Sequence, residues 1–314
     1  MKTTTHDAGE AAASMTQKSG LPVIGAPAPG EMGAAVAAAY VRAGGTALTV
    51  LAGRSAESRE RAAEAGMTAC ADLDELVAGC DLFLSIAPPA AALPLAEAAA
   101  ASMRRTGARP PFVECNAISP DHLVGIGALF DAEAFVDGGI IGMPPHGGRR
   151  PRLYISGPPC PALAHLDGVA FEIRPLGVRP GAASAIKMCY GGVTKGVNAI
   201  LMAALLTAEG FDLAEPFMAE LSASQSGLSR RLETGGPRLH ADAGRWAPEM
   251  REISQSFASR GLPGELHEGA ARLYEILDRS SLGAETRRTL DPARSALETA
   301  RIILADLRAE REDG

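Results

Sequence analysis

Lysine is almost absent from this sequence, which has only four in 314 residues. Lys2 and Lys18 fall in a small, polar stretch at the N-terminus, whereas Lys187 and Lys195 lie close together in SAIKMCYGGVTKG, residues 184–196. A general preference for arginine would make lysine scarce everywhere, but it would not explain why the body of the chain keeps it at one place. One of these two lysines is therefore a candidate for a working amine.

The chain also lacks the cysteine and histidine patterns of metal sites and disulfide scaffolds. Its five cysteines are widely spaced, odd in number and form no C-x-x-C, which favours buried thiols in a reducing compartment. The six histidines are scattered, and neither H-E-x-x-H nor a G-x-S-x-G motif is present. We therefore expect a cytoplasmic protein with no metal and no serine-hydrolase nucleophile.

Runs of basic residues and long apolar segments are missing as well. The net charge is −7 with a pI near 5.5, and the arginines are scattered, so the sequence predicts no nucleic-acid partner. No apolar run looks long and uninterrupted enough to span a bilayer, so we expect no membrane partner. Residues 1–20 have no apolar core of a signal peptide and are predicted to be a disordered tail.

The body of the chain has two halves with different patterns. Residues 21–180 alternate short apolar runs with alanine-rich helical stretches, which predicts a doubly wound α/β domain on a parallel sheet. The expected strands are VIGA, ALTVLAG, LFLSIAPP, PFVECN, AFVDGGIIG, RLYISG and VAFEIR. Residues 181–314 read as amphipathic helices, with Asp291-Pro292 as a predicted helix start.

The first expected strand runs into a glycine-rich turn and a small-residue helix, GAPAPGEMGAAVAAAYVRAGG. Such a turn lets backbone amides approach a pyrophosphate at a helix N-terminus. The G-x-G-x-x-G spacing falls on Ala28, Gly30 and Gly33, with alanine in the first position. A P-loop from Gly25 to Gly30 is disfavoured, because Glu31-Met32 stand where lysine and a hydroxyl belong. An ordinary tight turn remains open. The predicted cofactor residues here are Ala28, Pro29, Gly30, Glu31 and Met32.

The second expected strand ends in LAGRSAESRER. An NAD-binding domain usually places a carboxylate near this point for the ribose hydroxyls, whereas an arginine suits a 2′-phosphate. Arg54 and Ser55 therefore favour NADP(H) over NAD(H). A solvent-exposed surface arginine is the alternative.

Lys187 lies on an expected helix together with other polar groups. At 100° per residue, Gly191, Thr194 and Asn198 return close to its direction, and Lys195 lies about 80° away. A lysine on an apolar helix is costly to bury unless its charge is paired or its pKa falls, and a lowered pKa suits proton transfer near neutral pH. We expect Lys187 to be a general acid/base, against a side chain that simply reaches solvent; for Lys195 the second interpretation is favoured.

Four segments together resemble the β-hydroxyacid dehydrogenase and 6-phosphogluconate dehydrogenase superfamily, in its phosphogluconate-dehydrogenase-like NAD(P)-binding branch. They are APGEMGAAVA, ECNAISP, FVDGGIIG and PGAASAIKMCYGG. The resemblance implies an N-terminal Rossmann domain joined by a long helix to an all-helical domain that makes a homodimer. It further implies that Lys187 exchanges a proton during hydride transfer, and that Ala87, Pro88 and Asn116 face the cofactor. The loop from Asp137 to Gly142, with Gly138, Gly139, Ile140 and Ile141, would lie beside a small-molecule substrate.

Two positions depart from the family pattern. Ile141 stands where the family commonly has a serine, and Gly191 where it commonly has an asparagine. Both changes remove hydrogen-bonding groups, so a simple 3-hydroxy acid is disfavoured as substrate. Thr194 or Asn198 is a candidate replacement for the missing amide.

Two further polar segments are weaker candidates for the site. PPHGGRRPR, with His146, Arg149, Arg150 and Arg152, would bind a substrate anion if it folds over the site, but it reads more simply as an exposed loop tip. RLHADAGRWAPEM, with His240, Arg245 and Trp246, would meet the cofactor from the helical domain, although a single tryptophan more often serves packing.

The leading hypothesis from the sequence is an NADPH-dependent oxidoreductase acting on a small polar carbonyl or hydroxy compound. The alternatives are an imine reductase of the same fold, disfavoured by Lys187, and a non-catalytic NADP(H)-binding protein.

Overall fold

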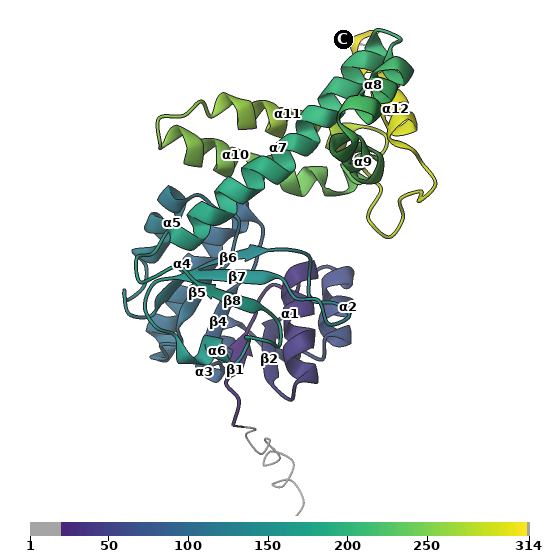
Figure 1. The fold of residues 1–314 in the computed structure, drawn as a ribbon. Coiled ribbons are helices and arrows are strands. Elements are labelled where there is room, and N and C mark those ends of the chain that lie inside the picture. Colours follow the sequence, from purple (N-terminus) through teal and green to yellow (C-terminus); the bar gives the residue numbers. More distant parts are fainter. Residues whose placement is uncertain (1–19, 313–314) are drawn as a thin grey trace, which may run out of the picture.

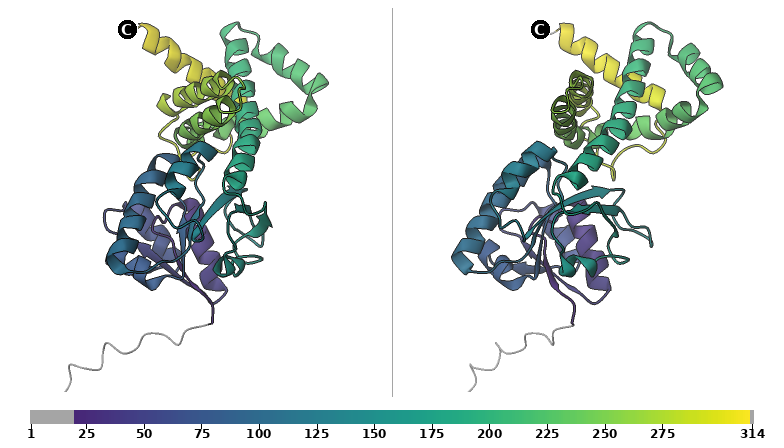
Figure 2. Two further views of the ribbon diagram at one scale, coloured as in Figure 1. Left: turned by 90° about the vertical axis from the view of Figure 1, so that its left-hand side faces the viewer. Right: turned by 60° about the vertical axis from the view of Figure 1, so that its left-hand side comes forward.

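The protein consists of a sheet domain and a helical domain, with one long helix running from the first into the second (Figures 1 and 2). The structure, a computed structural model, describes residues 20–312, so the tail predicted for residues 1–20 lies outside the described residues except for Gly20. This architecture confirms the predicted Rossmann and all-helical fold class.

The sheet has the strand order β3-β2-β1-β4-β5-β6-β7-β8. The strands are β1 (Val23–Gly25), β2 (Thr46–Val50), β3 (Thr68–Cys70), β4 (Leu82–Ser85), β5 (Phe112–Glu114), β6 (Phe135–Ile141), β7 (Arg152–Ser156) and β8 (Glu172–Pro175). The order reverses between β1 and β4, and ligands of open α/β sheets bind beyond the carboxyl ends of the strands at such a reversal. The loops after β1 and β4 flank that point.

Two features of the sheet differ from the sequence prediction. The edge strand β3 was not predicted, because two of its three residues are exposed and it lacks a buried apolar run. Strands β1 to β6 are parallel, but β7 is antiparallel to β6 and β8 follows the direction of β7. The connection from β6 to β7, residues 142–151, is too short for the helical crossover that a parallel pair needs, so it forms a hairpin.

Helices cover both faces of the sheet, as a continuous apolar strand pattern requires. One core contains Val36 and Tyr40 of α1 with Leu163 of α6; the other contains Leu76 of α3, Ala96 of α4 and their neighbours. The helices of this domain are α1 (Glu31–Arg42), α2 (Ala56–Glu64), α3 (Leu73–Gly79), α4 (Pro89–Thr106), α5 (Pro120–Gly127) and α6 (Pro161–Ala164).

The helical domain packs around the C-terminal part of α7 (Ala182–Gly210). Its core includes Met202 of α7, Met250 and Ile253 of α10, and Tyr274 of α11. The other elements are α8 (Ala214–Ser224), α9 (Ser226–Gly235), η1 (Gly236–Arg238), α10 (His240–Ala258), α11 (Glu265–Arg279) and α12 (Ala296–Glu312).

The start of α12 corrects the predicted helix start at Asp291-Pro292. Ser295 caps this helix: its hydroxyl accepts from the Glu298 N–H at 3.1 Å, and the Glu298 carboxylate accepts from the Ser295 N–H at 2.7 Å. Such a reciprocal capping box satisfies two terminal donors at once. Asp291 instead accepts from the Ala293 N–H at 2.9 Å in a local turn.

Helix α7 also corrects the expectation that no segment is long and apolar enough to span a bilayer. By length and composition it could, with a mean hydropathy of 1.3 over an 18-residue window, of which 39% is buried in the fold. Its first turns contact β6 and β7, and the rest contacts α8 to α12. These contacts give α7 the position of a core helix.

The two domains contact each other directly at two places. Glu252 of α10 accepts from the Ser119 N–H at 2.7 Å and lies 3.1 Å from His122 Nδ1, both at the start of α5. Arg287, in the loop before α12, lies 3.4 Å from Glu31 at the start of α1 and 2.8 Å from Asp242 of α10.

Candidate active site

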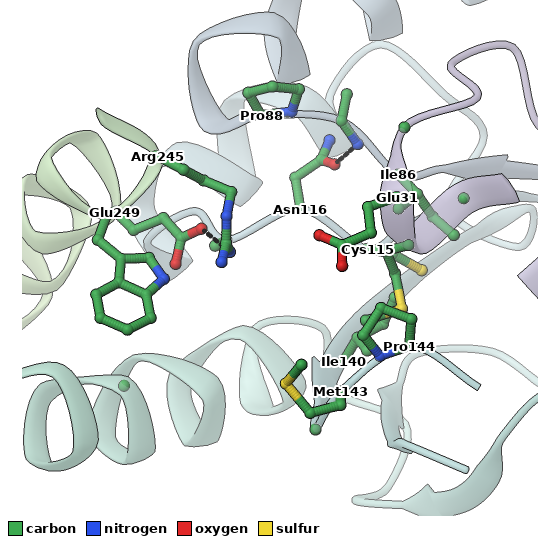
Figure 3. Close-up of a pocket in the computed structure, with 18 of the residues that line it drawn as sticks. Glu31, Ile86, Pro88, Cys115, Asn116, Ile140, Met143, Pro144, Arg245 and Glu249 are labelled. Carbon is green, nitrogen blue, oxygen red and sulfur yellow. Dashed lines mark hydrogen bonds and ion pairs between the residues drawn. The ribbon is translucent and has the colours of Figure 1, made fainter. Parts of the chain in front are cut away.

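A cavity of about 600 Å³ lies between the two domains, at the carboxyl edge of the sheet. Figure 3 shows Arg245 and Glu249 of α10 on one side, facing Glu31, Cys115 and Asn116 of the sheet domain. Fourteen predicted site residues and Lys187 line it: Ala28, Pro29, Gly30, Glu31, Met32, Arg54, Ala87, Pro88, Asn116, Ile140, Ile141, Gly191, Thr194 and Asn198. Ser55, Gly138 and Gly139 do not.

The turn between β1 and α1 is shaped to receive an anion. Gly30 is the N-cap of α1 and provides no side-chain cap, so N–H groups of the first turn remain free to bind a ligand. A Cβ on Gly33 would lie 2.7 Å from the Ala28 carbonyl oxygen, whereas a Cβ on Gly30 would meet nothing within 4 Å. The close turn and the open space beside the helix end fit a dinucleotide pyrophosphate.

Alanine variants of these two glycines test stability and cofactor binding separately. Gly33→Ala should destabilise the protein by about 1–3 kcal/mol, because the methyl group overlaps backbone that cannot move without opening the turn. Gly30→Ala should keep the wild-type melting temperature but weaken NAD(P)H binding by roughly tenfold or more, since its methyl occupies the space next to the helix end. Thermal melting and NAD(P)H titration measure both, and equal behaviour of the two variants would contradict the assignment.

Arg54 lies in the exposed loop after β2, and its Nη2 donates to the Pro27 carbonyl at 3.1 Å. This contact holds the guanidinium beside the cofactor turn. Ser55 has a different position from the predicted one: its hydroxyl caps α2 by accepting from the Ser58 N–H at 3.2 Å. Ser58, one turn later, lines the cavity instead.

Asn116 connects the loops after β4 and β5. Its carboxamide oxygen accepts from the Ala87 N–H, and its Nδ2 donates to Ser85 Oγ at 2.9 Å. Asn116 therefore fixes the loop of Ala87 and Pro88 at the cavity wall (Figure 3). Below it, the fully buried Glu114 accepts from the Asn116 N–H at 2.8 Å, and burial raises the pKa of this carboxyl group to about 7.

The side chain of Lys187, on α7, lines the cavity. Its Nζ donates to the Cys115 carbonyl at 3.0 Å, a neutral acceptor at the end of β5. Burial lowers the pKa of Lys187 below its ordinary value, and the carboxylate of Glu249 partly opposes this effect. The arrangement is an amine held beside a cavity and poised to exchange a proton.

Lys195 also lines the cavity, next to the gap at Gly191. A Cβ on Gly191 would lie in ordinary contact with Lys195 Nζ, at 3.5 Å, so this ammonium group stands directly beside the glycine. Lys195 pairs with Glu249 at 2.6 Å, and Glu249 pairs with Arg245 at 3.1 Å. Burial alone would raise the pKa of Glu249, but Lys195 and Arg245 outweigh it and lower the pKa.

Thr194 and Asn198 line the cavity, but their polar atoms are engaged by the protein. The Thr194 hydroxyl donates to the Tyr190 carbonyl at 3.0 Å, and Asn198 Oδ1 accepts from Arg231 Nε at 2.6 Å. The group beside the gap at Gly191 is thus Lys195, and neither Thr194 nor Asn198 fills it.

The predicted substrate loop divides into two parts. Ile140 and Ile141 line the cavity, whereas Gly138 and Gly139 pack inward. A Cβ on Gly139 would lie 2.4 Å from the Ala183 carbonyl oxygen, so glycine is needed for β6 to approach α7. The buried Asp137 accepts hydrogen bonds from the N–H groups of Ala183 and Ser184 in the N-terminal turn of α7.

Of the two weaker candidate segments, only the second contributes residues to the cavity. The 146–152 loop does not line the cavity; Arg150 donates to the Val169 carbonyl at 3.1 Å. Arg245 and Trp246 line the cavity, but His240 is buried against Glu285 at 2.9 Å. Within residues 20–312 no cluster of three or more His, Cys, Asp or Glu side chains is arranged to hold a metal ion.

Three charged residues that line the cavity were not predicted from the sequence as site residues: Arg231, Glu249 and Arg287. Arg231 occurs in SGLSRRL and Glu249 in APEMREI, both of which read as solvated faces of amphipathic helices. The one available signal is the four-residue spacing of Arg245 and Glu249, which is typical of an ion pair along a helix.

Comparison with known proteins places this architecture among characterised folds. The family described as Domain of unknown function (DUF1932) matches residues 208–277. The conserved protein MTH1747 of unknown function, whose structure was reported as similar to 3-hydroxyacid dehydrogenases, is 27% identical with a TM-score of 0.59, covering 82% of this chain and 96% of its own. A Mycobacterium tuberculosis 3-hydroxyisobutyrate dehydrogenase, solved with L-serine, is 18% identical with a TM-score of 0.60, covering 92% and 99%.

An uncharacterized 28.5 kDa protein of Methanothermus fervidus is 29% identical over 154 residues, which are 49% of this chain. The match spans 58% of that relative's length. The protein thus has the two-domain fold of MTH1747 and of the 3-hydroxyisobutyrate dehydrogenase. These similarities agree with the resemblance to the β-hydroxyacid dehydrogenase superfamily that the sequence indicated.

Proposed function

We propose that the protein is an NADP(H)-dependent oxidoreductase that interconverts a small polar carbonyl compound and its hydroxy form. The observation that carries the proposal is the position of Lys187, whose amine lines the same cavity as the cofactor turn. The similarity to MTH1747, whose structure was reported as similar to 3-hydroxyacid dehydrogenases, supports the proposal.

A nicotinamide dinucleotide, when bound, supplies or accepts the hydride. The uncapped start of α1 and the loop of Ala87 and Pro88 would hold it along the sheet edge. In the direction of reduction, the Lys187 ammonium donates its proton to the carbonyl oxygen; in oxidation, the neutral amine takes the hydroxyl proton. The apolar Ile140 and Ile141 help exclude water from this region.

We propose NADP(H) over NAD(H) on the position of Arg54 beside the turn. Arg54→Gln should weaken NADPH binding by about 10- to 100-fold, because a charge-assisted phosphate contact is lost. NADH, which lacks the 2′-phosphate, serves as the internal control and should bind the variant and the wild type alike. Titration of both cofactors measures the effect, and a parallel loss for NADH would refute the assignment.

Turnover can be tested by NADPH absorbance with a panel of oxo acids, neutral polar aldehydes and ketones, and cyclic imines. Reduction of a carbonyl compound supports the proposal. Exclusive reduction of cyclic imines would favour the imine reductase, and tight NADPH binding without turnover would favour a non-catalytic binding protein.

We further propose a cytoplasmic homodimer. Val193 and Ile200 of α7 and the following Phe211 and Leu213 are exposed apolar side chains, which a second copy could cover. The described cysteines are all free thiols, which suits a reducing compartment.

A further inference from the structure

The cavity is strongly cationic although the whole chain is acidic. Six cationic side chains line it, against the carboxylates of Glu31 and Glu249, while the chain carries a net charge of −7. The cations are Arg54, Lys187, Lys195, Arg231, Arg245 and Arg287. A cavity of this charge concentrates anionic ligands.

Most of these charges have a partner or a role already. Lys195 and Arg245 share Glu249, and Arg287 contacts Glu31 and Asp242. Arg54 lies at the cofactor turn, and Lys187 at the reacting centre. Within the part of the chain that the structure describes, Arg231 is the one cation of this set with neither an ion-pair partner nor a proposed role.

Arg231 is held firmly, but only by neutral groups. Its Nε donates to Asn198 Oδ1 and its Nη2 to the Thr194 carbonyl, each at 2.6 Å. Among the described residues, no carboxylate forms an ion pair with it, and Nη1 has no hydrogen-bond partner. A half-buried guanidinium without a counter-charge is costly, and its free N–H groups form a fork that matches a carboxylate or phosphate.

Arg231 lies about two to three helical turns from Lys187, the proposed general acid/base. Helix α9 lies beside α7 (Figure 1), and Arg231 contacts α7 at Thr194 and Asn198. At 1.5 Å per residue, these positions are about 10 Å and about 16 Å from Lys187 along the helix axis. An anion bound there would be several bonds away from a carbon that reacts beside Lys187.

We propose that Arg231 forms a distal anion subsite, which binds a carboxylate or phosphate at the end of the substrate remote from the reacting carbon. The inference rests on the proposed function for the identity of the near end, and it assigns the substrate to elongated, anion-ended oxo or hydroxy compounds. Asn198 and Thr194 are positioning residues that orient the guanidinium.

The test is a calorimetric titration of the NADPH-saturated protein with α,ω-dicarboxylates from malonate to suberate and with inorganic phosphate. Arg231→Gln should weaken the best-bound probe by about 10- to 100-fold. The matched control is Arg230→Gln, which alters the exposed neighbouring residue and should bind like the wild type. A preference for a longer dicarboxylate identifies a carboxylate end, and a preference for phosphate identifies a phosphate end.

Unchanged binding in Arg231→Gln, or no probe bound by the wild type, would overturn the subsite. If Arg231→Gln does not fold, Arg231→Lys decides: it keeps the charge but loses the fork, so weaker binding supports the subsite and unchanged binding overturns it. The same titration without cofactor reads anion binding independently of NADPH turnover. Failure of the proposed function is thus distinguishable from failure of the subsite.

Discussion

Replacing Lys187 with methionine should lower the rate of hydride transfer by about 10²- to 10⁴-fold, the usual contribution of a general acid/base. The affinity for NADPH should stay within about threefold of the wild type, because the amine donates to the Cys115 carbonyl and to no residue of the cofactor turn. Single-turnover measurements with NADPH separate the chemical step from binding. A wild-type rate in Lys187→Met would remove the role assigned to this residue.

Lys187→Arg is the matched control for charge. It keeps a cation at the position, but a guanidinium does not release its proton in the accessible pH range, so this variant should be nearly as slow as Lys187→Met.

The pH dependence has a defined sign, because burial lowers the pKa of Lys187. The wild-type reduction rate should fall as the pH rises through this lowered pKa, and the oxidation rate should rise over the same range. Both dependences should be lost in Lys187→Met.

Asp137→Ala should destabilise the protein by about 3–5 kcal/mol, the largest stability effect that we expect. Asp137 is fully buried at β6. Its Oδ2 accepts from the N–H groups of Gly181 at 2.8 Å and Ala183 at 2.9 Å and from Ser156 Oγ at 2.7 Å, and its Oδ1 accepts from Ser184 Oγ at 2.6 Å. Removing the carboxylate takes the shared acceptor away from these donors at the positive end of α7, and only the Ala183 N–H keeps another partner, Ser156 Oγ at 3.2 Å.

Urea unfolding followed by circular dichroism measures this effect as a lower midpoint. Asp131→Ala is the control, since Asp131 is exposed and should change stability by less than about 0.5 kcal/mol. Equal midpoints for the two variants would show that Asp137 does not hold α7. Because α7 carries Lys187, residual folded Asp137→Ala should also have lowered turnover.

The sequence located the parts of the site that depend on local chain geometry. A strand, a glycine-containing turn and a small-residue helix occur in succession, so the cofactor turn at Gly30 and Gly33 was visible as a pattern. Helical periodicity placed Gly191, Thr194 and Asn198 on the side of α7 that carries Lys187, and all four line the cavity. Because lysine is rare in this chain, Lys187 and Lys195 distinguish that helix by composition alone.

Other predictions failed where a local pattern had two structural outcomes. The run RLYIS is apolar enough for a strand in either direction, and the short 142–151 connection made it antiparallel. The sequence predicted a helix start at Asp291-Pro292, but the reciprocal bonds of Ser295 and Glu298 begin the helix later. In FVDGGIIG, Gly138 and Gly139 allow close approach of β6 to Cys115 and Ala183, whereas Ile140 and Ile141, at the end of the strand, line the cavity.

By itself, the sequence determined the two-domain fold, the glycine-containing turn after β1 and the helix that carries Lys187, because these follow from hydrophobic periodicity and glycine positions within short segments. Only the tertiary structure brought Arg231, Glu249 and Arg287 to the cavity and joined Asp137 to the start of α7. Those contacts connect residues more than 30 positions apart, and the packing of α9 and α10 against α7 decides which of many similar surface charges face inward.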